Sequence, residues 1–146
     1  MSTWFSYDVC TDVSATRRFF GELLGLEVVW EAEDDVAFVH DCVQLSYTRV
    51  ESLPRPAEWA FQPGWSHGQL ADAPAGQRIP SVSMALSPQG FGEAVRRLRA
   101  ADVERLRDEP FWVGYWSFVV RDPDGRTVEL SDPDSPGPGA SASDSQ

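Results

Sequence analysis

The residue best suited to chemistry in this chain, Glu129, lies in a segment that is repeated in the first half. Val128-Glu129-Leu130-Ser131 matches Val43-Gln44-Leu45-Ser46. A carboxylate at position 129 can bind a metal ion or move a proton, whereas the amide at position 44 carries no charge. The repeated segment predicts a duplicated fold, and the Gln-for-Glu difference raises the question of whether the chain holds a metal.

The repeated segments close two predicted βαβββ modules, which indicate an α+β fold. Asp12 is a suitable N-cap for the helix of the first module, and Gly25 is a suitable stop. Ser87, followed by Pro88, is the corresponding cap in the second module. The strands predicted in the first module cover residues 4–10, 26–30, 36–40 and 42–48. Those predicted in the second module cover residues 81–86, 103–107, 115–120 and 126–130.

Two segments fall outside the modules. A connection over residues 50–80 is rich in Pro and Gly, and a connection of that length is usually functional or mobile. Residues 133–146 are small and polar without periodicity, which predicts a disordered tail. We therefore expect a single domain over residues 1–132, with module one at 3–49 and module two at 81–132.

The composition is that of an acidic protein for which the cytoplasm is the default location. A net charge of −11 argues against nucleic acid, whose phosphates need a basic surface, and is compatible with a cationic ligand. No apolar run approaches the roughly 20 residues of a membrane span, and the first residues lack a signal-peptide pattern. All 12 basic residues are Arg, which excludes Schiff-base chemistry on a lysine. Cys10 and Cys42 lack metal-type spacing and are expected to be buried thiols.

Two longer segments carry a recognisable pattern. They are Phe19-Phe20-Gly21-Glu22-Leu23-Leu24-Gly25-Leu26, after Asp12, and Arg121-Asp122-Pro123-Asp124-Gly125-Arg126-Thr127-Val128-Glu129-Leu130. They resemble the vicinal oxygen chelate superfamily, which includes glyoxalases, extradiol dioxygenases and bleomycin-resistance proteins. The resemblance covers residues 4–132 and implies that the two modules form a cupped, eight-stranded mixed sheet with the helices on its outer face. It also implies a homodimer, and for the bleomycin-resistance-like branch it implies ligand crevices between subunits.

The resemblance also implies positions for a metal, because enzymes of this superfamily bind one between four side chains. The first and last strands of each module supply these side chains, usually as His, Glu, His and Glu. Here the four positions are Phe5, Gln44, Ser81 and Glu129. A phenyl ring has no donor atom, and a hydroxyl is a poor ligand for zinc, nickel or iron. We therefore expect no metal site and no cofactor.

Strand alternation instead predicts a crevice suited to a flat molecule. Small hydroxyls and an amide would orient a ligand, and tryptophans would stack on it. Glu109-Pro110-Phe111-Trp112 is similar to an acidic-Pro-Trp segment of bleomycin-resistance proteins, with Phe111 as an insertion. Trp30 and Trp116 also suit a core or dimer interface. The expected ligand-binding residues are Phe5, Tyr7, Gln44, Ser46, Trp59, Phe61, Trp65, Ser81, Ser83, Phe111, Trp112, Trp116 and Glu129.

Three functions remain open at this point. The first is metal-independent sequestration of a planar aromatic natural product or antibiotic, neutral or cationic, that gives self-resistance. The second is a metal-independent enzyme of secondary metabolism in which Glu129 acts as acid or base. The third is a degenerate metal-dependent enzyme of the glyoxalase or dioxygenase type. The expected partners are a small aromatic ligand and a second copy of the chain, with neither nucleic acid nor membrane.

Overall fold

The computed structural model describes residues 2–57, 59 and 81–139, and the chain forms two compact units. The first unit comprises Met1–Arg55 together with the turn Asp122–Gly125, and the second comprises Pro56–Arg121 together with Arg126–Gln146. No helix in the described part of the chain has the length and apolar character needed to cross a bilayer.

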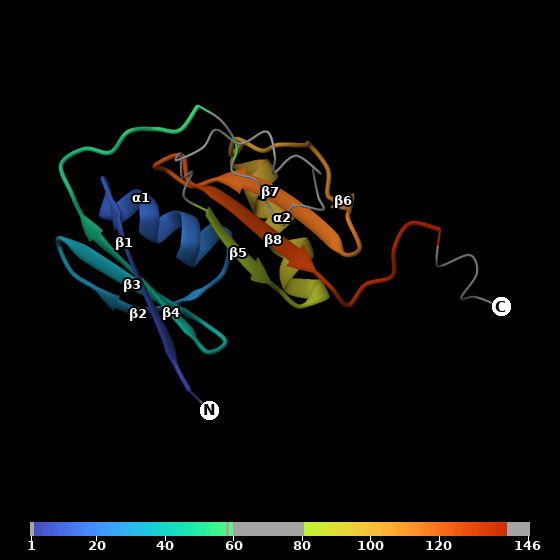
Figure 1. Cartoon of the computed structure of the whole chain (residues 1–146), viewed down its shortest axis with the longest axis horizontal. Coiled ribbons are helices and arrows are strands. Elements are labelled where there is room, and N and C mark those ends of the chain that lie inside the picture. Colours follow the sequence, from blue (N-terminus) through green and yellow to red (C-terminus); the bar gives the residue numbers. More distant parts are fainter. Residues whose placement is uncertain (1, 58, 60–80, 140–146) are drawn as a thin grey trace, which may run out of the picture. The chain divides into compact units, whose positions relative to one another are not determined.

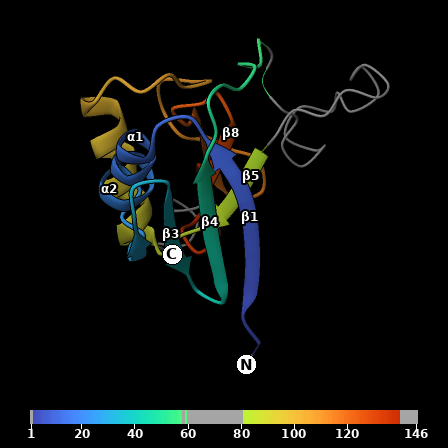
Figure 2. The ribbon, with the colours of Figure 1, turned by 90° about the vertical axis from the view of Figure 1, so that its left-hand side faces the viewer.

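The first unit is a four-stranded mixed sheet with one helical segment. Strand β1 is followed by α1 and a π-helical turn, η1, and then by three strands in the sheet order β1-β4-β3-β2. β1 and β4 run parallel and lie side by side in Figure 2, whereas the other neighbours are antiparallel. The elements are β1 (Trp4–Cys10), α1 (Val13–Arg17), η1 (Arg18–Leu23), β2 (Glu27–Glu31), β3 (Asp35–His40) and β4 (Val43–Arg49).

The second unit repeats this plan. Its sheet order is β5-β8-β7-β6, with β5 and β8 parallel and the other neighbours antiparallel (Figure 1). The matching orders confirm the duplicated α+β fold, while the closure of both sheets into one cup stays a prediction. The elements are β5 (Ser81–Ala85), α2 (Pro88–Ala100), β6 (Phe111–Trp112), β7 (Trp116–Arg121) and β8 (Thr127–Asp132).

Two predicted elements differ from the structure. The strand expected over residues 103–107 is reduced to a single bridge between Arg105 and Val120, and β6 forms further along the chain. Asp102 has a φ of 54° at the end of α2, and Arg105 is held by short-range ion pairs, so this stretch turns instead of extending. In the first unit, the predicted helix changes to π-helical bonding, in which the Leu24 amide donates to the Phe19 carbonyl.

An aromatic cluster joins the helical segment to one face of the first sheet. The Phe20 ring stacks on the Tyr47 ring with centroids 5.0 Å apart, and it also contacts Phe38. Phe20, Phe38 and Tyr47 are buried, as is Cys10, which confirms the prediction for that thiol; Cys42 is only partly buried. Because side chains alternate along a strand, the residues between these positions point to the opposite face of the sheet. The aromatic cluster does not cover that face.

Helix capping follows the sequence prediction in both units. The Asp12 carboxylate accepts a hydrogen bond from the Ala15 amide, and Gly25 has a φ of 87°, which suits a glycine after a helix. In the second unit, the Ser87 hydroxyl accepts from the Gly90 amide at 3.1 Å.

We predict that Ser87→Ala lowers the free energy of unfolding by about 1 kcal/mol, because one amide of the first turn of α2 loses its partner. Chemical denaturation monitored by circular dichroism measures this loss. Gln89→Ala, an exposed change in the same turn, is the matched control. Equal stability of the Ser87 and Gln89 variants would show that the cap contributes nothing.

Candidate functional site

The second unit encloses a carboxylate surrounded by hydroxyl groups. Glu129 is 0% exposed, and its Oε1 accepts a hydrogen bond from the Ser83 hydroxyl at 2.7 Å. Its Oε2 accepts from the Tyr115 hydroxyl at 2.8 Å and from the Ser117 hydroxyl at 2.7 Å. Within the described residues, the hydrogen-bond partners of this carboxylate are thus all hydroxyls. They link buried Ser117 to Ser83, which is exposed.

Strand register explains how these groups meet. Glu129 is paired with Ser83 on β5, while Ser81 is paired with Thr127. In the first unit, Phe5 of β1 is paired with Gln44 of β4 in the same way. The residue equivalent to Phe5 is therefore Ser83, which corrects by two positions the assignment of Ser81 from the sequence. Ser81 is exposed, and its side chain shares a face with Ser83.

The hydroxyl shell restricts what Glu129 can do. Each carboxylate oxygen already accepts at least one hydrogen bond, and neither reaches solvent. Burial, followed by the hydrogen bond to Glu129 and its charge, raises the pKa of the Tyr115 phenol above its ordinary value. Tyr115 is therefore a hydrogen-bond donor and not a base at neutral pH. Both oxygens of Glu129 are thus buried and engaged by hydroxyl groups, and neither is exposed to a substrate.

The equivalent face of the first sheet is open and aromatic. Register places Tyr7, Ser46, Ala37 and Trp30 in one row across the four strands. A second row contains Phe5, Gln44, Val39 and Glu27. Phe5 is 56% exposed, Tyr7 78% and Trp30 58%. Gln44 and Ser46 are partly exposed between them, so the predicted residues Phe5, Tyr7, Gln44 and Ser46 do share one accessible surface.

The sequence indicated a core or dimer-interface position for Trp30, whereas a β-bulge places it on the open face. The register of β2 on β3 shifts between Val28 and Trp30. Val28 pairs with Phe38 and faces the helical segment, whereas Trp30 pairs with Ala37 and faces the open side. Simple alternation gives both residues the same face, so the sequence pattern hid this tryptophan. On that face its Nε1 donates to Asp35 Oδ1 at 2.7 Å, and Glu27 supplies a second carboxylate to the same face from the next row of β2.

The other predicted aromatic residues lie in the second unit or outside the described residues. The Trp59 ring is stacked on the guanidinium of Arg121, 4.3 Å from the ring centroid, so one of its faces is already occupied. Phe111 has Arg107 over its ring at the same distance. Trp112 and Trp116 form an edge-to-face pair with centroids 5.5 Å apart. Phe61 and Trp65 fall outside the described residues.

The residues at the superfamily's metal positions do not fit a divalent ion. The first unit offers a phenyl ring and an amide, Phe5 and Gln44; the second offers a hydroxyl and a carboxylate, Ser83 and Glu129. Structural and catalytic metal sites require imidazole, thiolate or available carboxylate ligands. Over the described ranges, no group of three His, Cys, Asp or Glu side chains comes together as a potential metal site.

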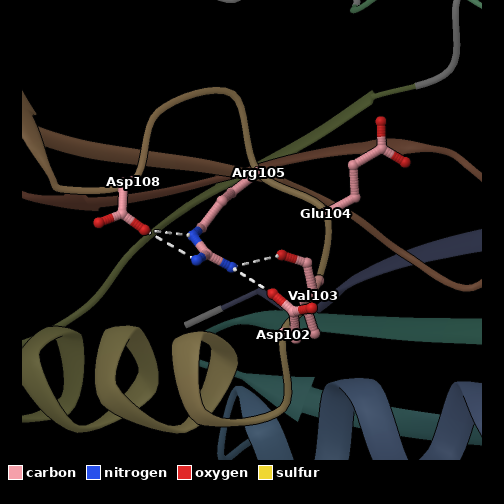
Figure 3. Close-up of a pocket in the computed structure, with 5 residues that line it drawn as sticks. All are labelled: Asp102, Val103, Glu104, Arg105 and Asp108. Carbon is pink, nitrogen blue, oxygen red and sulfur yellow. Dashed lines mark hydrogen bonds and ion pairs between the residues drawn. The ribbon is translucent and has the colours of Figure 1, made fainter.

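A surface pocket follows α2 in the second unit, and Glu129 is not among the residues that line it (Figure 3). It is lined by Asp102, Val103, Glu104, Arg105 and Asp108. Arg105 donates to Asp108 at 2.8 Å and reaches Asp102 at 3.5 Å, and its hydrogen bond lowers the pKa of the Asp108 carboxyl. The guanidinium is thus already paired with the carboxylates around it. These ion pairs hold the turn that follows α2, and the pocket is part of that turn.

The sequence model of the glyoxalase-like domain matches residues 4–131. The chain belongs to the glyoxalase-like domain family. This match confirms the resemblance to the vicinal oxygen chelate superfamily. It does not single out the bleomycin-resistance-like branch. Among curated proteins, none matches this glyoxalase-like protein.

Solved structures share the fold of this glyoxalase-like protein at low sequence identity. A glyoxalase/dioxygenase from Nostoc punctiforme has a TM-score of 0.66 and 18% identity, covering 90% of each chain. A glyoxalase/bleomycin resistance protein/dioxygenase from Alicyclobacillus acidocaldarius has a TM-score of 0.60 and 12% identity, again covering 90% of each chain. The fosfomycin resistance protein FosX from Mesorhizobium loti has a TM-score of 0.60 and 11% identity, covering 97% of this chain and 96% of its own. At these identities the likeness is one of fold alone.

Proposed function

We propose that this protein binds and sequesters a planar aromatic, cationic natural product or antibiotic without a metal, as a cytoplasmic homodimer. The observation that carries the proposal is the open face of the first sheet. Three large aromatic side chains are exposed there, Phe5 and Tyr7 on the edge strand β1 and Trp30 on the opposite edge strand β2, with Glu27 and Asp35 on the same face. Large exposed aromatic groups gathered on one surface are typical of binding sites.

The chemistry of this face favours a flat cation. Aromatic side chains stack on planar ring systems, and their faces attract positive charge. The two carboxylates add Coulombic attraction, and the net charge of −11 favours the approach of a cation. Ser46 and Gln44 lie between the aromatic groups and supply hydrogen-bonding atoms that orient the ligand.

The second unit supports binding over turnover. A general base needs a carboxylate oxygen within reach of the substrate proton. Both oxygens of Glu129 are buried and accept hydroxyl hydrogen bonds, which disfavours the alternative of an enzyme using Glu129 as acid or base. The fold is compatible with a role in resistance, because structures with this fold include a fosfomycin resistance protein.

We predict that Trp30→Ala weakens the binding of a tricyclic acridinium dye such as proflavine about tenfold, or about 1.4 kcal/mol. Calorimetric titration measures the dissociation constant. Trp4→Ala is the matched control, because Trp4 is 69% exposed but alternates to the other face of β1 from Phe5 and Tyr7. The proposal fails if both variants lose affinity equally, or if the dye binds no tighter than to an unrelated acidic protein.

We also predict that EDTA leaves both dye affinity and melting temperature unchanged, because residues 5, 44, 83 and 129 do not form a divalent metal site. Elemental analysis of the purified protein should find less than one equivalent of zinc, nickel, iron or manganese. A stoichiometric metal whose removal abolishes binding would instead support a degenerate metal enzyme. Recovery of the dye chemically unchanged after prolonged incubation separates binding from conversion.

A further inference from the structure

The chain that leaves β8 makes a turn and contacts two tryptophans of the second unit. Asp132, the last residue of β8, is buried and pairs in register with Trp116 on β7. Its Oδ1 accepts hydrogen bonds from the amides of Asp134 at 3.0 Å and Ser135 at 3.1 Å. Residues 133–137, here called the strap, belong to the segment that the sequence predicted to be disordered. The capped turn directs the strap toward the tryptophan pair of β6 and β7.

Two contacts seat the strap on this pair. Trp116 Nε1 donates a hydrogen bond to the Pro136 carbonyl at 2.8 Å. The backbone of Gly137 lies against the Trp112 ring so closely that a Cβ there would be 2.7 Å from two ring carbons. Any side chain at position 137 would therefore collide with a rigid ring, and only glycine allows this approach. Trp112 remains 40% exposed beyond the contact.

This geometry shares two elements with aromatic surfaces that recognise proline-containing segments. Such surfaces combine an indole N–H that donates to a peptide carbonyl with a ring face that accepts the extended chain. The sequence Asp132-Pro133-Asp134-Ser135-Pro136-Gly137-Pro138 is suited to this role, because prolines restrict the free chain and reduce the entropy lost on binding.

We propose that the Trp112–Trp116 pair is a binding surface for proline-glycine segments, and that the chain's own strap occupies it. The surface goes beyond the proposed ligand binding and does not depend on it. An attached strap has a millimolar effective concentration, so it excludes a weak peptide added in solution. Once the strap is unseated, the same surface accepts a peptide of that sequence from outside.

The experiment uses the full-length protein with Gly137→Val, which unseats the strap by collision with Trp112. The probes are a synthetic peptide with the sequence of residues 132–138 and a control peptide with valine at the position of Gly137. The indole N–H resonance of Trp116, identified by its loss in Trp116→Phe, reports on the carbonyl contact. Gly137→Ala is a second, smaller change, and circular dichroism establishes that both variants are folded.

We expect Gly137→Val to shift the Trp116 indole resonance and the native peptide to return it toward its wild-type position. The valine peptide should bind at least tenfold more weakly, and wild-type protein should respond to neither peptide at the same concentration. Pro138→Ala, one residue beyond the contact, should leave the resonance in place. An unchanged resonance in both Gly137 variants would overturn the proposal. Equal binding of the two peptides would also overturn it.

Discussion

Replacing Glu129 with alanine is expected to lower the free energy of unfolding by about 3–5 kcal/mol. The substitution removes three hydrogen bonds to a charged acceptor and leaves the buried Ser117 hydroxyl without this partner. It also leaves a cavity where the side chain was. Urea denaturation followed by tryptophan fluorescence gives the difference directly.

Glu129→Gln is the informative companion, because it keeps the shape and one acceptor oxygen. We expect it to lose about half as much stability as the alanine variant, since the amide nitrogen cannot accept from the hydroxyl it faces. Glu33→Ala, at an exposed acidic turn, controls for the change in net charge. A loss in Glu129→Ala no larger than that of Glu33→Ala would mean that the hydroxyl shell does not stabilise the fold.

Arg121→Ala is expected to cost about 2–4 kcal/mol, because this guanidinium organises the start of the connection between the modules. Arg121 is 5% exposed and donates to Glu104 at 3.0 Å. It also donates to the carbonyls of Pro56 and Ala57 and stacks on Trp59. Removing the guanidinium takes hydrogen-bond donors away from the carbonyls of Pro56 and Ala57 and from the Glu104 carboxylate.

The control separates geometry from charge. Arg121→Lys keeps the charge but loses the planar fork, so it should recover less than half of the lost stability. Arg96→Ala, on an exposed face of α2, should have almost no effect. Near-ultraviolet circular dichroism should change for both Arg121 variants, because Trp59 loses its stacking partner. Full rescue by lysine would show that charge alone holds Pro56, Ala57 and Trp59.

Local signals in the sequence predicted most of the fold. Asp12, Ser87 and Gly25 act through short-range backbone geometry, and each has its predicted role in the structure. The matched segments around Gln44 and Glu129 occupy equivalent strands, β4 and β8, because the two modules repeat the same sheet order. These features depend on a few neighbouring residues, and a single sequence displays them.

Features that depend on register between strands were not predictable in the same way. The sequence placed Ser81 at the position that Ser83 occupies, because the start of a strand does not reveal its pairing partner. Tyr115 and Ser117 were missed as partners of Glu129, since their approach requires the pairing of β7 with β8. The available signal was the spacing of Tyr115 and Ser117, two hydroxyl residues that alternation places on one face at the start of β7.

The bulge between Val28 and Trp30 makes the identity of the first sheet's open surface depend on one residue. If the unaltered β2 paired with β3 without the bulge, alternation from Val28 would turn the indole of Trp30 toward the helical segment and put Val29 on the exposed side. Deleting Val29, by contrast, would leave the tryptophan paired with Ala37 and keep the indole on the open face. For the design or evolution of binding in such sheets, the register of β2 is as decisive as residue type.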